Sequence, residues 1–436
     1  MVEAKSTLEL TDKETISHPL SCEQQALYEF EQPYPGTTVH VIGGALRVVG
    51  TIDVSLFAQA VQHVVQKHAS LHLQLFAEQG QVLQRPVNPG TIDVPIHDLR
   101  GTANALSYVR ELIGIRIKIP FQPLLNAVLF EVSLYRIEDD QLLFFAKIHH
   151  ILTDVWSLDL LGKEVLSSYV QLKAGATLFI DSRPSYLEYV ADEQRYLSSE
   201  KYQRDEDFWL TRMGAAPESS FRRVPQQLRA KRIVYDVPQV LSQLFYQFAY
   251  ENSVHLSSLF ITLACLYMRR ETANPDVCVG AVCANRWGSH YRNVMGPFGF
   301  GFPFRTRVEQ NTLNSELVKR VNSELRACYS HLPFPVGRLN QQAQLADRGY
   351  GNFYGIMVNY YNNMLKSLTI EGLEASYEEA DKGCSPHALQ LNVRADQTNK
   401  AIRLELIYNP ELVQASQVQS FRAYLEASIA HGQSGL

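Results

Sequence analysis

The 436-residue sequence lacks the marks of a secreted, membrane-spanning or metal-binding protein. Residues 1–18 are polar and mixed in charge, without the apolar stretch of a signal peptide. No apolar run approaches the ~20 residues that a bilayer-spanning helix needs. The cysteines form no CxxC pair and are too few for a disulfide framework, which favours buried, reduced thiols in a cytoplasmic protein. They are Cys22, Cys265, Cys278, Cys283, Cys328 and Cys384.

Positive charge is not in excess either, because 40 Lys and Arg residues stand against 45 Asp and Glu residues. The resulting net charge of −5 gives no electrostatic support for a nucleic acid or an anionic membrane as a partner. What is present is 46% apolar and 19% charged residues, a composition typical of a globular protein. A chain of this length fits two lobes of about 200 residues each better than one core.

Strand-like and helix-like patterns alternate along the whole chain, which predicts an α/β or α+β fold. The clearest strand is 142–150, where Leu142, Phe144, Ala146, Ile148 and His150 fall on one face. The other predicted elements are a strand at 46–49, a helix capped by Asp53, a mainly strand-like segment at 119–135, a helix around 160–169, a polar connecting helix at 185–213, a helix at 256–268, strands at 277–284, 353–360 and 403–408, a Gly/Phe-rich loop at 296–304 and a last helix at 414–430.

The order of these elements divides the chain into two lobes joined by a polar segment. The stretch 175–184 separates the first lobe from the connecting helix, and the second lobe begins near Arg232. We therefore expect a leader or linker at 1–17, a first lobe at 18–178, a connecting helix and linker at 179–231, a second lobe at 232–432 and a tail at 433–436.

One segment combines residues that can carry out chemistry: His149-His150-Ile151-Leu152-Thr153-Asp154-Val155-Trp156-Ser157. It lies where the apolar strand ends and a helix begins, so rigid elements on both sides would fix its side chains. A neutral imidazole can take a proton from an amine or hydroxyl at physiological pH. An Asp four residues later could pair with an Arg or cap the first turn of the helix.

The same residues also allow a purely structural interpretation, since a His pair at a strand end is often a packing feature. A zinc site is disfavoured, because His149 and His150 would point to opposite faces of a strand and no third ligand stands at a familiar spacing. The sequence therefore predicts no metal site.

The segment resembles the HHxxxDG core motif of nonribosomal peptide synthetase condensation domains, which are relatives of chloramphenicol acetyltransferase. Seven further segments match motifs of this family, in the family's order, across nearly the whole chain. They are Pro19-Leu20-Ser21 with Gln24 or Gln25, Lys67 to His72, Pro120-Phe121 with Pro123-Leu124-Leu125, Ser185 to Tyr189, Gly280 to Arg286, Met295 to Phe298 followed by Pro303-Phe304-Arg305, and Tyr408-Asn409.

The resemblance implies two acetyltransferase-like lobes in a V-shaped pseudodimer with a central tunnel. Donor and acceptor groups, delivered on the phosphopantetheine arms of carrier proteins, would enter from opposite mouths and meet at His150. His149 would be its mostly structural neighbour, and Asp154 would be held by Arg286 or, as second choice, by Arg305. The backbone N–H after Asp154 could stabilise an oxyanion. The chain itself would bind no cofactor and would act as a monomer.

The sequence departs from the family pattern at positions that the resemblance places in the tunnel. Val155 replaces the family's Gly, and a β-branched residue would be strained there if the backbone needed a positive φ. Phe300-Gly301 replaces the family's Asn-Thr, which would suit an apolar acyl donor or would simply place Phe300 in the core.

Two neighbours of the motif bear on the type of reaction. Trp156 fits family members that take an L-configured or achiral donor. Ser157 followed by Leu158 fits the condensing members, whereas epimerising members usually carry Trp at the second of these positions. Cyclising members have Asp in place of the first His and are disfavoured.

Three functions are compatible with these observations. The first is an enzyme that forms an amide or ester bond between carrier-bound substrates. The second is a catalytically silent domain that recruits a partner to a carrier protein, for which Val155 and the lost Asn-Thr speak. The third is a coenzyme A-dependent acyltransferase, which would share the His150 base.

Overall fold

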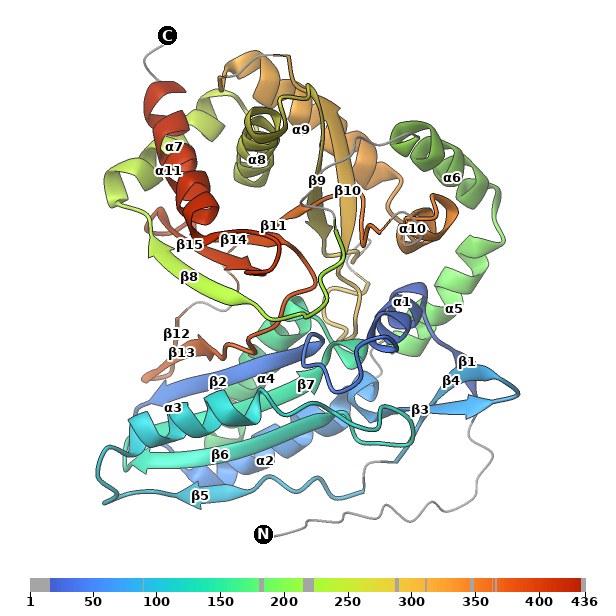
Figure 1. Cartoon of the computed structure of the whole chain (residues 1–436). Helices are drawn as coiled ribbons and strands as arrows, with labels where there is room; N and C mark the ends of the chain where they lie inside the picture. Colours follow the sequence, from blue (N-terminus) through green and yellow to red (C-terminus); the bar gives the residue numbers. More distant parts are fainter. Residues whose placement is uncertain are drawn as a thin grey trace.

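The computed structural model describes residues 16–432 except 89, 180–183, 215–222, 287–289, 310–311, 346–348, 363 and 365–366. Residues 1–15 of the expected leader and the tail at 433–436 lie outside the described residues. Helices and strands alternate through the described chain and form two six-stranded mixed sheets, one above the other in Figure 1. This arrangement confirms the predicted α/β class.

The first sheet is covered by helices on both faces. Leu143 and Phe145 face α3, whereas Phe144, Ala146 and Ile148 pack with α2 and α4 on the other side, which explains the unbroken apolar run in this strand. The strand order is β12 (Leu368–Ile370), β13 (Leu373–Glu379), β2 (Val41–Val49), β7 (Gln141–His149), β6 (Phe130–Glu138) and β5 (Ile96–Asp98), and the helices are α2 (Val54–Lys67), α3 (Ala105–Arg116) and α4 (Val155–Lys173).

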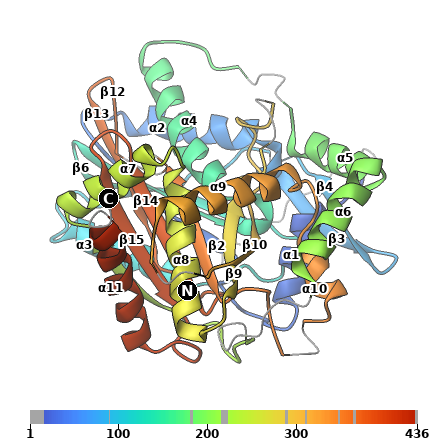
Figure 2. The ribbon, with the colours of Figure 1, turned by 90° about the horizontal axis from the view of Figure 1, so that it is seen from above.

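The second sheet is apolar on one face and polar on the other. Figure 2 shows helices laid over its apolar face, and its polar face turns toward the first sheet, where Arg394 pairs with Glu379 of β13. The strand order is β10 (Phe300–Arg307), β9 (Asp276–Cys283), β11 (Ile356–Asn362), β14 (Leu389–Asp396), β15 (Ala401–Tyr408) and β8 (Lys231–Asp236), and the helices are α7 (Gln239–Glu251), α8 (Leu256–Thr272), α9 (Ser315–Ser330) and α11 (Ala415–Gly432).

Strands β12 and β13 come from the range expected for the second lobe, yet they extend the first sheet. β13 pairs antiparallel with β2, from Glu374 opposite Val49 to Glu379 opposite Gly44. Two glycines let β2 fit between its neighbours: a Cβ on Gly43 would lie 2.2 Å from the Ala146 carbonyl oxygen, and one on Gly44 would lie 2.3 Å from the Glu378 carbonyl oxygen. The two halves are therefore interleaved, and the chain crosses back to the second sheet between Glu379 and Leu389.

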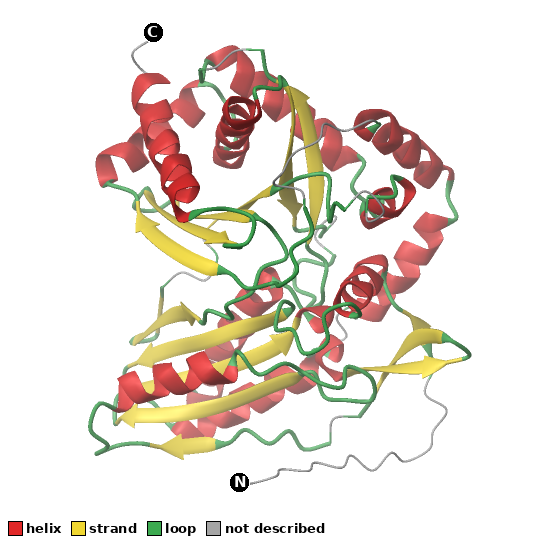
Figure 3. Cartoon of the chain, in the orientation of Figure 1, coloured by secondary structure: helices red, strands yellow, loops and turns green. Residues whose placement is uncertain are grey.

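Most of the remaining elements lie along one side of the junction between the sheets (Figure 3), whereas η2 connects β7 to α4. The sequence predicts one connecting helix at 185–213, but the structure has two helices there, α5 and α6. Ser199 accepts a hydrogen bond from the Tyr202 N–H and thereby caps the start of the second helix. These elements are β1 (His18–Pro19), α1 (Cys22–Glu31), η1 (Ala69–His72), β3 (Leu73–Glu78), β4 (Gln81–Pro86), η2 (His150–Leu152), α5 (Tyr186–Leu197), α6 (Glu200–Met213) and α10 (Gly337–Gln342).

Other predicted elements differ in extent. Residues 119–129 contain Pro120 and Pro123 and are irregular, so the strand predicted at 119–135 begins only at Phe130. The predicted Gly/Phe-rich loop contains the start of β10, because Phe302 and Phe304 alternate into the core of the second half. No helix among the described residues is long and apolar enough to cross a membrane.

The prediction of buried cysteines is correct for half of them. Cys265, Cys278 and Cys328 are buried, and none of the six, all of which lie within the described residues, forms a disulfide. The other three are partly exposed: Cys22 begins α1, Cys283 ends β9, and Cys384 lies in the segment between β13 and β14.

We expect Gly44→Ala to destabilise the fold, because the added methyl group meets the backbone of β13, which cannot move without breaking its pairing with β2. Overpacking of this kind costs about 1–3 kcal/mol. Gly114→Ala in α3 is the matched control, since nothing lies within 4 Å of its added Cβ, and it should be neutral or slightly stabilising. Chemical denaturation of both variants measures the effect, and a Gly44→Ala protein as stable as the parent would contradict this account of the crossover.

Candidate active site

The HHxxxD segment forms a tight connection between β7 and α4. β7 ends at His149, the 3₁₀ turn η2 follows, and Asp154 caps α4 by accepting a hydrogen bond from the Ser157 N–H. The predicted strand face therefore ends one residue early, and His150 does not continue the row formed by Phe144, Ala146 and Ile148. The turn releases His150 from the pleat of the sheet.

His149 is a structural residue of this turn. Its Nδ1 accepts a hydrogen bond from the Ile151 N–H at 3.1 Å, so Nε2 carries the proton and donates to Glu31 Oε1 at 3.0 Å. The side chain is only 2% exposed. Its two hydrogen bonds fix the ring and thereby fix the backbone that presents His150.

Glu31, at the end of α1, joins a second imidazole to this arrangement. The same Oε1 atom accepts a hydrogen bond from His40 Nδ1 at 2.8 Å. Burial alone would raise the pKa of Glu31, but the hydrogen bonds from His149 and His40 outweigh it and lower that pKa to about 2. Glu31 and His40 carry no local sequence signal, since they lie 118 and 109 positions before His149 in the chain and meet it only through the fold.

His150 is held by its backbone and has a neutral side chain. Its N–H donates to the His40 carbonyl oxygen at 2.6 Å, and the two rings lie 6.4 Å apart. Its Nδ1 is buried and has no hydrogen-bond partner among the described residues. Burial, together with the nearby His40 and Lys382, lowers the pKa of His150 to about 4, although Asp154 opposes the shift. The imidazole is therefore uncharged at physiological pH.

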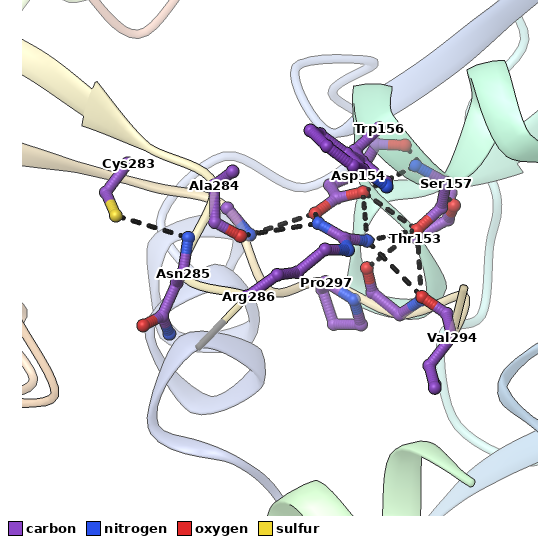
Figure 4. Close-up of polar contacts among 12 residues, drawn as sticks. Thr153, Asp154, Trp156, Ser157, Cys283, Ala284, Asn285, Arg286, Val294 and Pro297 are labelled. Carbon is purple, nitrogen blue, oxygen red and sulfur yellow. Dashed lines mark hydrogen bonds and ion pairs between the residues drawn. The ribbon is translucent and has the colours of Figure 1, made fainter. Parts of the chain in front are cut away.

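Asp154 and Arg286 form a buried ion pair between the two halves of the molecule (Figure 4). The guanidinium donates from its two terminal nitrogens to Asp154 Oδ2 at 2.6 Å and Oδ1 at 2.9 Å, and the Gly299 N–H donates to Oδ2 at 3.0 Å. The side chains are 6% and 2% exposed. Burial would raise the pKa of Asp154, but the attraction of Arg286 and the hydrogen bonds keep it below its usual value.

Of the two arginines considered from the sequence, the structure pairs Arg286 with Asp154. Arg305 is the wrong partner: it lies on β10 opposite Cys278, and its side chain reaches Asp276 on the neighbouring strand at 2.6 Å. Position on the strand explains the difference, because Arg286 follows the end of β9, whereas Arg305 lies within the sheet.

Two residues for which the sequence predicts a place in the tunnel, Trp156 and Ser157, contact the ion pair. Ser157 Oγ accepts from Arg286 and from the Gly296 N–H, and it donates to Asp154. Trp156 lies under the Arg286 guanidinium, and its Nε1 donates to the Arg292 carbonyl oxygen at 2.9 Å. Both residues therefore strengthen the contact between the halves.

The family-departing residues have clear structural settings. Val155 is the first residue of α4 and has no positive φ, so its side chain is not strained and its N–H stands at the free start of a helix. Phe300 packs, half-buried, against the core of the second half. Gly301 makes room for β11, since an added Cβ would lie 2.4 Å from Met357 Cε and 2.9 Å from Tyr354 Oη.

Two pockets flank the crossing segment at 380–388. The aromatic pocket has Phe30, Tyr34, Tyr354 and His387 in its wall, and the Phe30 ring lies 5.3 Å from the His40 ring. The charged pocket has Val155, Arg232, Tyr377, Glu379 and Lys382 in its wall. Phe30 links the aromatic pocket to His40, whose carbonyl oxygen holds the His150 N–H, and Val155 of the charged pocket directly follows Asp154 of the HHxxxD segment.

We expect Asp154→Ala to lower the free energy of unfolding by about 3–5 kcal/mol, because it leaves the Arg286 charge buried without its partner. Asp154→Asn should cost less, since the amide oxygen can still accept hydrogen bonds. Asp276→Ala is the matched control: it breaks a similar pair with Arg305 whose side chains are 26% and 22% exposed, and exposed pairs contribute about 0–1 kcal/mol. Equal stability of the Asp154→Ala and Asp276→Ala proteins would contradict the structural role of Asp154.

Comparison with known proteins agrees with this architecture. The chain is 28% identical over 333 residues to surfactin synthase subunit 1 of Bacillus subtilis (strain 168), which covers 75% of this chain and 9% of that protein. It is 24% identical over 421 residues to the dimodular nonribosomal peptide synthase of the same organism, covering 94% of this chain and 17% of that protein. The chain thus spans less than a fifth of the length of these relatives.

Solved structures show the same fold. The starter condensation domain of rhizomide synthetase, in complex with C8-CoA, superposes with a TM-score of 0.85 at 21% identity and covers 95% of both chains. The first condensation domain of the calcium-dependent antibiotic synthetase, in complex with a substrate analogue, gives a TM-score of 0.83 at 18% identity and covers 96% of both chains. The family model described as "Condensation domain" matches residues 15–433. With its HHxxxD turn and its interleaved halves, the chain belongs to the condensation domain family.

Proposed function

We propose that the chain forms an amide or ester bond between a thioester-bound acyl donor and an amine or hydroxyl acceptor, with His150 at the reaction centre. The observation that carries this proposal is His150 itself, a neutral imidazole whose backbone is fixed in the turn between β7 and α4. An imidazole held in one position can orient an acceptor against a donor carbonyl. We propose that both are delivered on phosphopantetheine arms of carrier proteins to a monomer that holds no cofactor of its own.

In the proposed reaction the acceptor's nitrogen or oxygen bonds to the thioester carbonyl carbon, and the carbon–sulfur bond breaks. The departing thiolate takes up the proton that the acceptor loses. Because its pKa is about 4, His150 is better suited to accept a hydrogen bond from the acceptor and orient it than to hold the proton. The N–H of Val155, at the start of α4, could stabilise the negative charge that develops on the carbonyl oxygen.

The other residues of the motif act through position. His149 and Glu31 hold the turn, and Asp154 with Arg286 joins the turn to the second half. The silent-domain alternative drew on possible strain at Val155, and the unstrained helical position of that residue removes this argument. The coenzyme A alternative keeps one supporting observation, the similar rhizomide synthetase domain in complex with C8-CoA. Donors on carriers and on coenzyme A should therefore be compared side by side.

We expect His150→Ala to lower the rate of product formation by about 10²-fold or more, because the acceptor loses its orienting group. His97→Ala is the matched control, since His97 is an exposed residue of β5, and it should retain the parental rate. Intact-mass detection of product on the acceptor carrier measures the effect across a panel of donors. Near-parental turnover of His150→Ala, with the chemical step rate-limiting, would contradict the proposal.

With a hydroxyl acceptor, which does not titrate in this range as an amine would, the rate of the chemical step should be nearly constant from pH 8 to about pH 5.5 and should fall as the pH approaches 4. The reason is that protonation removes the hydrogen-bond-accepting form of His150, whose pKa is lowered to about 4. The neighbouring titratable groups support this range: the lowered pKa of Asp154 keeps it charged, the lowered pKa of His40 keeps it neutral, and Lys382 acts on His150 in the same direction as His40. Single-turnover rates, with the fold checked at each pH, test this. An acid limb centred near the ordinary histidine value of 6.5 would contradict it.

A further inference from the structure

The charged pocket contains charged and polar side chains for which the proposed bond-forming reaction has no use. Part of its wall is apolar and is formed by Val41, Ile42, Val155 and Leu158. The rest includes charged and polar side chains from β8, from β13 and from the crossing segment. A substrate that enters beside Val155 would therefore lay an apolar stem against one side and would bring its far end to polar groups.

Lys382 is a basic residue in this wall that forms no salt bridge with a described residue. Its Nζ donates to the Val39 carbonyl oxygen, and no carboxylate lies within ion-pair distance of it among the described residues. Its backbone is anchored to the first half, because Thr38 Oγ1 donates to the Lys382 carbonyl oxygen at 3.3 Å. The ammonium group has two further N–H donors, and the anchored backbone fixes where the side chain begins.

The neighbouring carboxylates are already engaged. Glu379 pairs with Arg394 and stands 3.9 Å from Arg232, and both arginines also pair with Glu405. Two arginines therefore face two glutamates, and the other carboxylates that act on Lys382 are Glu31, which is held by His149 and His40, and Asp381. Asp381, an exposed residue at the rim, accepts a hydrogen bond from the Gly383 N–H.

Tyr377 adds an independent observation to the same wall. Its hydroxyl oxygen is buried and has no hydrogen-bond partner among the described residues. Burial raises the pKa of Tyr377 well above its ordinary value, so the group keeps its proton and is a donor. A buried donor without an acceptor is costly in a folded protein, and a ligand oxygen would satisfy it.

We propose that the charged pocket binds a carboxylate at the far end of one substrate's acyl group, with Lys382 Nζ and Tyr377 Oη as the donors. An ammonium and a hydroxyl are suited to an anionic oxygen pair, and the apolar side of the pocket suits a short aliphatic stem. The substrate class is then an acyl group of a dicarboxylic acid. This inference rests on the proposed function for the direction of the acyl group, with its reacting carbonyl at His150. Burial lowers the pKa of Lys382, and a bound carboxylate would raise it again.

Equilibrium binding of three stable pantetheine analogues tests this proposal without any reaction. Each carries an amide in place of the thioester and differs at the far end of a five-carbon acyl chain: glutaryl ends in a carboxylate, glutaramoyl in a neutral amide and pentanoyl in a methyl group. We expect the glutaryl analogue to bind the wild-type protein at least 10-fold more tightly than the other two. The preference should vanish in Lys382→Met, which keeps the aliphatic stem, and should shrink several-fold in Tyr377→Phe, which removes one oxygen.

Two further variants separate this inference from the proposed function. Glu379→Gln removes a negative charge from the same wall and should strengthen glutaryl binding. His150→Ala should lose turnover but keep the preference for the glutaryl analogue. If His150→Ala keeps both the preference and the parental turnover, only the proposed function is overturned and the pocket assignment stands. Equal binding of glutaryl and glutaramoyl analogues to the wild-type protein, or no measurable binding of any of the three, would overturn the pocket assignment.

Discussion

The ion pair between Asp154 and Arg286 is the interaction on which the rest of the site depends. It places two charges where water is almost excluded, which is costly unless hydrogen bonds compensate both groups. The compensation comes from both halves of the molecule: Ser157 lies in the first turn of α4, and Gly299 precedes β10 of the second sheet. The ion pair therefore ties the turn that carries His150 to the second half, while His149 and Glu31 hold it within the first, and the proposed reaction centre lies at the junction.

A second constraint acts on the opposite side of the same turn. β13 leaves the second half to pair with β2, and the chain then returns past His40 toward β14. Gly43 and Gly44 permit this approach, and the returning segment forms part of the wall of both pockets. The topology thus places Lys382 near His40 and His150, where its charge adds to the burial that keeps both imidazoles neutral. The crossing segment at 380–388 therefore both connects the two sheets and brings Lys382 close to the two imidazoles.

The sequence predicts the parts of this architecture that follow from local patterns. The apolar run before His149, the cap at Asp154 and the helix after it are all recoverable from periodicity and spacing, and the motif order identifies Arg286 as a partner. It does not predict contacts that only the fold creates. Glu31 and His40 meet His149 across more than a hundred residues, β13 joins a distant sheet, and Arg305 is diverted to Asp276 by its position within β10. The prediction of a single connecting helix is wrong, because Ser198 ends one helix and Ser199 begins the next.

The central claim is that Asp154 and Arg286 act on His150 as one unit. A double-mutant cycle on the single-turnover rate of bond formation, with Asp154→Asn, Arg286→Gln and the combined variant, tests it most directly. The account predicts that each single variant lowers the rate and that the combined variant loses little more than the more damaging single change. Losses that multiply in the combined variant, or single variants with the parental rate, would contradict it.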